Sequence, residues 1–469
     1  MSFWYRNGVC SNNSRPRRGS RISARQGIGG LAALCGVAAM AQAQNLPAGM
    51  AVRFNIDERL EYNDNPDLAV TPESEFVSRT NLTFGLDSIT PTQEFSLNFG
   101  GRLELGSDDI DSTGIIDPFL DLSYLRDVGH ATFSTGLQFR EVDVNTLVFN
   151  ENFFNDGNLL VLDQGKQQNI GFDIGAEIGI DAPVGASFDY GHRRLKYSGT
   201  SDARLVDSTT DSFDGQVNFR IDPRITARLT ARHIDYDIDG PGIDRVTTGY
   251  GVGVALDVTP SLTADVNLSH DRIELGDTGS DVEQGLSLAI DLSREMINGT
   301  AGLEVSSRVT ETGRRETLRV RREMELPTGD LSFSLGAVWT DSGVDPLYGL
   351  NYVHALPRGV FSASLQQSVS TTSDNIAVIN TGLALGYVQN LDAISSLSAN
   401  FGVNGSNLIG STGSDTQRVD MSVTYRRELT SDWGLVGGIG HTLAKSDGTP
   451  DRRSNRIFIG LQRGFVWNP

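Results

Sequence analysis

The chain has 469 residues, a formal net charge of −20, a hydrophobic fraction of 38% and a mean hydropathy of −0.22. The acidic balance argues against nucleic acid as a partner, because phosphate binding needs a basic surface. The low hydropathy does not exclude a membrane β-barrel, because barrel strands alternate polar and apolar residues.

Residues 1–43 are predicted to form an export signal. They carry six arginines and no acidic residue, and an apolar run from Ile28 to Ala41 follows the arginines. The sequence Ala41-Gln42-Ala43 fits the signal-peptide cleavage rule, in which two small residues flank one residue of any type. The apolar run is too short for a membrane-spanning helix.

The mature chain, residues 44–469, is predicted to form one domain. Without the signal it holds 33 basic and 59 acidic residues, a net charge of −26. The two cysteines, Cys10 and Cys35, both lie in the signal, so we expect no disulfide in the mature protein.

Runs of alternating polar and apolar residues follow one another along the mature chain. In the stretch "FSLNFGGRLELGSD", the apolar residues Phe95, Leu97 and Phe99 alternate with the polar residues Ser96 and Asn98. The alternation continues, with Leu103 and Leu105 at the apolar positions and Arg102 and Glu104 at the polar positions; we call each of the two alternating sets a phase. The run 313–326 places several Arg and Glu residues on one face, which would be costly in a dry core. The pattern therefore predicts an apolar face toward lipid and a polar face toward a water-filled lumen.

The breaks between the runs are of two kinds that alternate nearly throughout. Short breaks contain Pro, Asp or Gly, and long breaks are acidic and polar. Bacterial outer-membrane barrels have short periplasmic turns and longer outer loops. The predicted strands are 51–62, 76–88, 93–106, 117–126, 129–142, 167–180, 184–198, 208–222, 224–238, 245–258, 261–274, 281–294, 297–311, 313–326, 329–342, 346–357, 359–371, 375–388, 391–407, 416–428, 431–444 and 455–467.

The predicted fold is all-β: a closed antiparallel transmembrane β-barrel of about 22 strands, or 20 to 24 if a hairpin is miscounted. The hairpins 297–326 and 359–388 have the weakest pattern. Residues 44–50 leave too little chain for a folded plug domain before the first strand. The last strand carries Ile457, Ile459, Leu461, Phe465 and Trp467 in one phase, a form of C-terminal strand that the barrel assembly machinery reads.

The mature start, "AVRFNIDERLEYNDNPDLAVTPESEFVSRTNLTFGLD", resembles the opening hairpin of β-barrel porin families of Gram-negative bacteria, some of which are linked to exopolysaccharide operons. The resemblance rests on a strand ending in Tyr62, a loop entry at Asn63-Asp64-Asn65, and a second alternating strand. It implies an outer-membrane pore and carries no catalytic residues.

Charged residues on the polar phase are the candidate pore-lining residues. Their mixed signs predict no clear ion selectivity. The candidates are Arg79, Arg102, Glu104, Arg140, Asp173, Glu177, Arg220, Arg228, Arg232, Asp265, Arg319 and Arg321.

The longest break, 143–166, is apolar, unlike the other loops, and exposed apolar loops of this length need something to pack on. One hypothesis is that this third outer loop folds into the lumen and narrows it. The candidate constriction residues are Phe149, Asn150, Glu151, Asn152 and Asp156. The alternative is a hairpin that turns at Asp156-Gly157 and extends two strands above the membrane.

The sequence gives only weak indications of metal binding, catalysis or sugar stacking. Asp235, Asp237 and Asp239 resemble the start of an EF-hand loop, but Val246 replaces the bidentate glutamate, so we expect no metal and no cofactor. Ser269-His270-Asp271 cannot form a relay on a strand, because neighbouring side chains point to opposite faces. We expect no enzyme activity. The aromatic residues on the lipid phase are expected to form interfacial girdles rather than sugar-stacking sites.

The predicted function is passage of hydrophilic solutes or of polysaccharide across the cell outer membrane. One alternative is a non-transporting structural or adhesive surface protein, whose acidic loops bind partners or lipopolysaccharide through divalent ions. Another is a soluble β-rich periplasmic or secreted protein. The expected partners are outer-membrane lipid and lipopolysaccharide, and the sequence predicts no oligomeric state.

Overall fold

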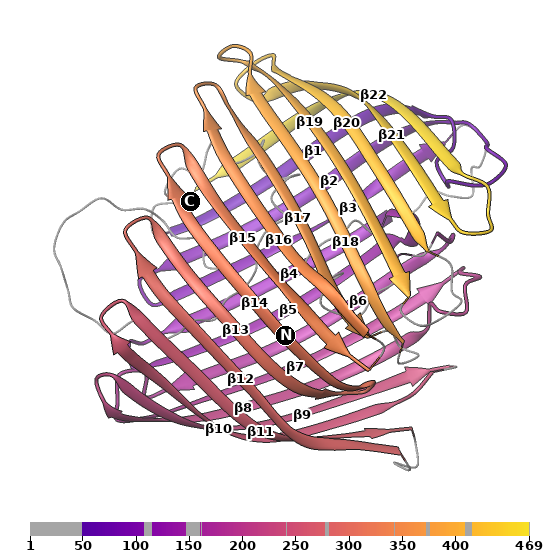
Figure 1. Cartoon of the computed structure of the whole chain (residues 1–469). Coiled ribbons are helices and arrows are strands. Elements are labelled where there is room, and N and C mark those ends of the chain that lie inside the picture. The colour runs from indigo at the N-terminus through magenta and orange to yellow at the C-terminus, as the bar shows by residue number, and fades with distance from the viewer. Residues whose placement is uncertain are drawn as a thin grey trace.

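The computed structural model describes residues 49–106, 115–146, 160, 162–240, 242–276, 281–341, 343–371, 376–408 and 415–468. Within these residues the protein is one β-barrel (Figure 1). Its strands are β1 (Gly49–Asn63), β2 (Glu75–Thr90), β3 (Gln93–Gly106), β4 (Ile115–Asp127), β5 (Ala131–Asp143), β6 (Lys166–Ile178), β7 (Val184–Ser198), β8 (Asp207–Asp222), β9 (Ile225–Asp239), β10 (Arg245–Thr259), β11 (Leu262–Leu275), β12 (Asp281–Met296), β13 (Gly299–Thr310), β14 (Gly313–Leu326), β15 (Gly329–Thr340), β16 (Gly343–Leu356), β17 (Gly359–Thr371), β18 (Ala377–Asn390), β19 (Ser395–Leu408), β20 (Thr416–Glu428), β21 (Trp433–Ser446) and β22 (Arg452–Trp467).

Each strand pairs antiparallel with the next strand along the chain, and β1 pairs with β22, which closes the ring. The described chain therefore forms a closed 22-stranded sheet, and the predicted strand number is confirmed. Both weakly patterned hairpins are present, as β13–β14 and β17–β18. The described residues contain no plug domain. Among them no helix is long and apolar enough to span a membrane.

One end of the barrel carries short turns and both ends of the described chain. The turns β2–β3, β12–β13 and β14–β15 have two residues each between their strands. Gly299 follows one of them with a φ of 124°, and a Cβ there would lie 2.2 Å from the carbonyl oxygen of Glu323, so only glycine fits. Short turns mark the periplasmic end of an outer-membrane barrel.

The opposite, extracellular rim is uneven. Most connections there are long, but β13–β14 and β15–β16 are joined by turns of only two residues. The alternation of short and long breaks therefore fails at these two hairpins, and the rim carries no long loop from β13 to β16.

The two faces of the strands differ as the sequence predicts. On β3, Phe99, Leu103 and Leu105 are 41%, 41% and 60% exposed, while the Glu104 side chain between them is 15% exposed and lies in an ion pair. We call the exposed apolar set of residues the lipid-facing phase and the opposite set the lumen-facing phase. A closed barrel with an apolar outer belt and short turns at one end is an outer-membrane barrel of the Gram-negative type.

Candidate pore and its inner wall

Contacts between strands that are not neighbours identify the inner face. Arg418 on β20 donates to the carbonyl oxygen of Asn145, which lies just after β5. Arg452 on β22 donates to the carbonyl oxygen of Leu162, just before β6, over 3.2 Å. Such contacts are possible only through the interior of the ring, so the phase that contains these arginines faces the lumen.

All the candidate pore-lining residues from the sequence lie on this lumen-facing phase by strand register. Most of the arginines form ion pairs with carboxylates of another strand, either the adjacent strand or the one beyond it. The pairs are Arg79 with Glu61 and Glu104, Arg102 with Asp117 at 2.9 Å, Arg140 with Asp121 at 3.8 Å, Arg228 with Asp265, Arg232 with Asp214 at 2.9 Å, Arg319 with Glu304 at 3.9 Å, and Arg321 with Asp291 at 2.7 Å.

The remaining candidates lie elsewhere on the same phase. Arg220 is near the periplasmic rim, where its guanidinium donates to the carbonyl oxygens of Ile180 and Asp181 over 3.2 and 3.0 Å. Asp173 and Glu177 face the lumen from β6, opposite Gly136 and Thr132 of β5. Strand alternation can find such residues, but it does not give their partners.

We call the lumen-facing side of β1–β14 the charged wall. Its ion pairs join adjacent strands or strands one further apart, so these cations are neutralised by carboxylates of the same wall. Glu61 is the most deeply placed carboxylate of the pairs above, with a side chain 4% exposed against the Arg79 guanidinium. Sequence reasoning did not select Glu61, although it shares a phase with Arg59 and Asp57 on β1.

The lumen-facing side of β17–β19, which we call the neutral wall, is different. These three strands contain no Asp, Glu, Lys or Arg on either face. Most of their inner residues are hydroxyl, amide and small side chains, and Val360, Val378, Val388 and Leu408 share the same phase. The polar and small residues are Ser362, Ser364, Gln366, Ser368, Ser370, Asn380, Gly382, Ala384, Gly386, Ser396, Ser398, Asn400, Gly402, Asn404 and Ser406.

The two ends of the β5–β6 connection fold inward onto the inner wall. The 3-10 turn η3 (Val144–Thr146) leaves β5, and Val144 is 3% exposed. The backbone N–H of Leu160 donates to Ser406 Oγ over 3.1 Å, and Leu160 is 4% exposed. Ser406 in turn donates to Asn380 Oδ1 over 2.6 Å. The Leu160 end of this apolar segment therefore packs at the extracellular part of the neutral wall, and the η3 end contacts Arg418 of β20.

The β1–β2 connection joins the same cluster. Asn145 donates its side-chain amide to the carbonyl oxygen of Asp67 over 2.9 Å. Asn65, 1% exposed, donates to the carbonyl oxygens of Ala69 and Arg453. Two connections that are distant in sequence thus share one set of hydrogen bonds at the extracellular mouth.

Asp163 links the β5–β6 connection to the β7–β8 loop by hydrogen bonds. Its carboxylate accepts hydrogen bonds from the Ser201 N–H and Oγ at 2.6 and 2.9 Å and from the Asp202 N–H at 2.8 Å. Burial opposes ionisation of Asp163, but the hydrogen bonds from Asp202 and Ser201 outweigh it and hold its pKa below the ordinary value.

The five candidate constriction residues, Phe149, Asn150, Glu151, Asn152 and Asp156, lie outside the described residues, as does the predicted signal of residues 1–43.

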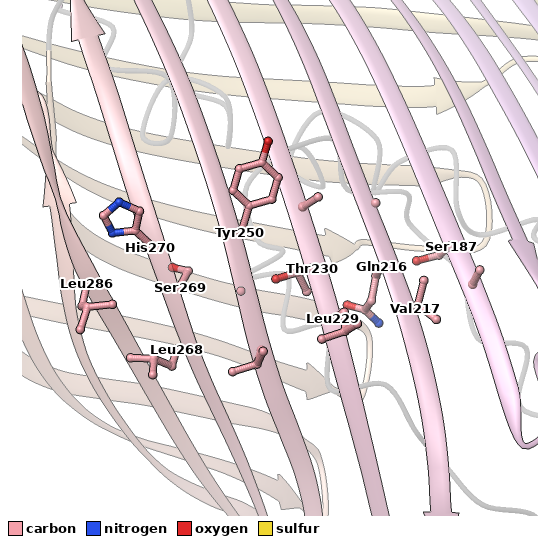
Figure 2. Close-up of a pocket in the computed structure, with 15 residues that line it drawn as sticks. Ser187, Gln216, Val217, Leu229, Thr230, Tyr250, Leu268, Ser269, His270 and Leu286 are labelled. Atoms are coloured by element: carbon pink, nitrogen blue, oxygen red, sulfur yellow. The ribbon is translucent and has the colours of Figure 1, made fainter.

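The outer wall holds a cavity of about 750 Å³ along β7–β12 (Figure 2). Its lining includes Leu229, Tyr250, Leu268 and Leu286 of the lipid-facing phase, and small residues such as Ala231 leave the space between them. It is therefore a groove in the membrane-facing wall rather than part of the lumen.

His270 and Ser269 both line this groove, His270 from the lipid-facing phase, and the Ser269 hydroxyl donates to Asp271 over 3.0 Å on the lumen-facing phase. As predicted, His270 points to the face opposite to that of Ser269 and Asp271. Among the residues that the structure describes, no group of three or more His, Cys, Asp or Glu side chains is arranged to hold a metal ion.

No protein-family model and no curated protein matches the sequence. Solved structures do match the fold. A mutant ferric enterobactin receptor from Pseudomonas aeruginosa has a TM-score of 0.53 at 10% identity, with 88% of this chain and 81% of that chain covered. The FrpB iron transporter from Neisseria meningitidis has a TM-score of 0.53 at 8% identity, with 90% and 83% covered. The siderophore receptor PirA from Acinetobacter baumannii has a TM-score of 0.52 at 7% identity, with 88% and 80% covered.

At these identities the likeness concerns the fold alone. This chain is a 22-stranded outer-membrane β-barrel that resembles TonB-dependent receptor barrels. The structures that it resembles are transport barrels rather than enzymes.

Proposed function

We propose that the barrel is a pore for passive passage of hydrophilic solutes across the outer membrane. The observation that supports it best is the lumen-facing phase itself: ion pairs on one wall and uncharged hydrogen-bonding groups on the other. Such a surface is stable when water covers it, because charged groups are costly to bury without solvent.

Within this function, the neutral wall favours an uncharged polyhydroxylated solute, of which a polysaccharide is one form. Serine hydroxyls and asparagine or glutamine amides both donate and accept hydrogen bonds, as sugar hydroxyls do. A sugar chain moving along β17–β19 exchanges hydrogen bonds with water without displacing ion pairs. We place the narrowest part of the passage where Leu160 and Asn145 pack on the inner wall, and we propose that residues 143–166 narrow the lumen there.

Conductance across a planar bilayer tests the proposal. Purified mature protein, shown to be folded by its faster migration in unheated detergent gels, is expected to give stable ohmic steps in salt. Swelling of protein-containing liposomes should admit neutral oligosaccharides up to a size limit. Folded protein that gives no conductance and no swelling would favour the alternative, a structural or adhesive surface protein.

Deleting residues 147–159 refines the test. If the β5–β6 connection narrows the lumen, the deletion should raise single-channel conductance and the sugar size limit together. Unchanged conductance in a folded deletion variant would mean that this segment stands above the membrane instead.

A further inference from the structure

The barrel wall is interrupted between β16 and β17. Their ladder covers only the periplasmic part of the two strands, from Leu356 opposite Gly359 to Gly349 opposite Gln366. Above it, residues 343–348 of β16 pair with β15 alone, and residues 367–371 of β17 pair with β18 alone. We call this unpaired stretch the seam.

Proline explains why the seam begins where it does. Pro346 lies in the unpaired part of β16, and its carbonyl oxygen accepts a hydrogen bond from the Gln367 side-chain amide over 2.7 Å. That carbonyl faces β17, so a ladder there would need a backbone N–H that proline lacks. The Gln367 side chain spans the interruption instead and is 8% exposed.

A second side chain braces the seam from inside the lumen. Arg315 on β14 reaches past β15 and β16 to donate to the Val369 carbonyl oxygen and to Thr371 Oγ1, over 3.5 and 3.1 Å. Its Nε is buried and has no hydrogen-bond partner. Ser370 is 7% exposed, and its Oγ is likewise buried without a partner. The closed seam therefore leaves buried polar atoms unsatisfied, which opposes closure.

The seam lies below the level of Trp339 and has apolar residues on both faces, beside Asp345, Ser368 and Ser370 on the lumen-facing phase. On the lipid-facing phase, Val344 is 59% exposed, and Trp339 opposite it on β15 marks the outer interface. On the lumen-facing phase, Val338, Leu347 and Val378 are 1%, 5% and 0% exposed. These three residues, on β15, β16 and β18, present buried apolar side chains on the lumen-facing side of the strands around the seam.

We propose that the seam is a lateral port through which the hydrocarbon chain of a single-chain amphiphile passes between the outer leaflet and the lumen. The apolar residues behind the seam receive the chain, and the hydroxyl and amide groups of the neutral wall receive an uncharged head group. The Gln367 side chain reaches across the gap to the Pro346 carbonyl oxygen, so the width of the gap suits one hydrocarbon chain. Gln367 is the latch that holds the port closed.

The matched variants are Gln367→Ala, which removes the latch, and Gln366→Ala, which removes the same side chain one residue away, opposite Gly349 in the paired ladder. The probe is a dodecyl maltoside carrying a photoreactive diazirine on its last chain carbon, held in the liposome bilayer below its micelle concentration. Cross-linked peptides are located by mass spectrometry. Heat-modifiable gel migration confirms that both variants fold.

Labelling of the segments around Leu347 and Val378 is expected in the wild-type protein. It should rise about fivefold in Gln367→Ala, the factor expected from loss of one ordinary hydrogen bond, and stay at the wild-type level in Gln366→Ala. Labelling confined to outer residues such as Val344 and Val369 in all three proteins would overturn the port. Equal increases in both variants would also overturn it, because the probe would then be arriving through the lumen.

A distance measurement checks the opening without any amphiphile. Nitroxides at Asp345 and Ser368, on opposite sides of the seam, should show a longer and broader distance distribution in Gln367→Ala than with native Gln367. An unchanged distribution would show that Gln367 does not hold the two strands together. Neither experiment depends on what the lumen conducts.

Discussion

The charged and neutral walls enclose the same lumen but are held together differently. On the charged wall, arginines and carboxylates of different strands form ion pairs, as Arg228 of β9 does with Asp265 of β11 and Arg321 of β14 does with Asp291 of β12. On the neutral wall, β17–β19 contain no charged residue, and one end of the β5–β6 connection packs against it through Leu160 and Ser406.

The difference separates two tasks. Paired charges keep a wall hydrated while adding little net electric field, because each paired charge lies at ion-pair distance from an opposite charge on the same wall. A wall of hydroxyl and amide groups can instead be covered by a packed segment or a passing solute without stripping water from ions. One side of the lumen is therefore suited to stay hydrated, and the other to make contacts.

The largest expected effect is on the charged wall. Glu61→Ala removes a buried partner of Arg79 and should lower the free energy of unfolding by about 3 kcal/mol, the lower end for breaking a buried ion pair, because Glu104 still contacts Arg79. Denaturant unfolding in detergent measures it. A loss near zero would mean that Arg79 is well hydrated and that the charged wall is not held by its pairs.

The next effect concerns the segment that packs on the neutral wall. Asp163→Asn should lower the unfolding free energy by about 1 kcal/mol, because the carboxylate accepts several hydrogen bonds from the Ser201–Asp202 backbone and side chain. The folded pKa of Asp163 lies below the unfolded value of about 3.9, so its contribution is complete at neutral pH and is lost as the pH falls through the lowered pKa. Denaturant titrations at pH 7 and pH 3 should therefore show a smaller acid-induced loss in Asp163→Asn than in the wild type.

A smaller effect is expected on ion selectivity, with opposite signs on the two walls. Asn400→Asp adds an uncompensated negative charge to the neutral wall and should raise the cation-to-anion permeability ratio about twofold to threefold, as expected for a charge about 7 Å from a permeating ion in water. Asp265→Asn removes the partner of Arg228 and should lower the ratio. Reversal potentials in a salt gradient measure both. Shifts of the same sign would contradict the assignment of the two walls to one lumen.

The smallest effect tests how little a single group contributes to the neutral wall. Ser364 is 8% exposed, and its Oγ is buried without a hydrogen-bond partner, so Ser364→Ala should change the unfolding free energy by less than about 0.5 kcal/mol or stabilise the barrel. A loss above about 1 kcal/mol would indicate that the hydroxyl has a partner, such as ordered water.

The strand number and the two phases could be predicted from the sequence because each strand carries its own pattern of alternation and its own turn signals. Even the weak hairpins 297–326 and 359–388 are present. The partners of the charged residues could not be predicted, because they depend on the register between strands: Arg79 meets Glu61 and Glu104 only once both neighbouring ladders are fixed.

Neither the seam nor the inward packing of the β5–β6 connection could be predicted from the sequence. Pro346 is visible as a strand-breaking residue, but only the ladder shows that it interrupts pairing with β17 rather than with β15. The apolar character of residues 143–166 indicated that they pack on something, and the contact of Leu160 with Ser406 identifies part of that surface.

Thiol accessibility tests the central claim, that the polar phase lines a water-filled lumen on both walls, most directly. The only native cysteines are Cys10 and Cys35, so single cysteines can be placed in the mature chain without background. Ser398→Cys and Asn98→Cys, on the neutral and the charged wall, should react quickly with a membrane-impermeant maleimide in proteoliposomes. Leu397→Cys and Leu97→Cys, one residue away on the lipid-facing phase, should be protected. Equal reactivity within either pair, or faster reaction of the leucine positions, would contradict the account.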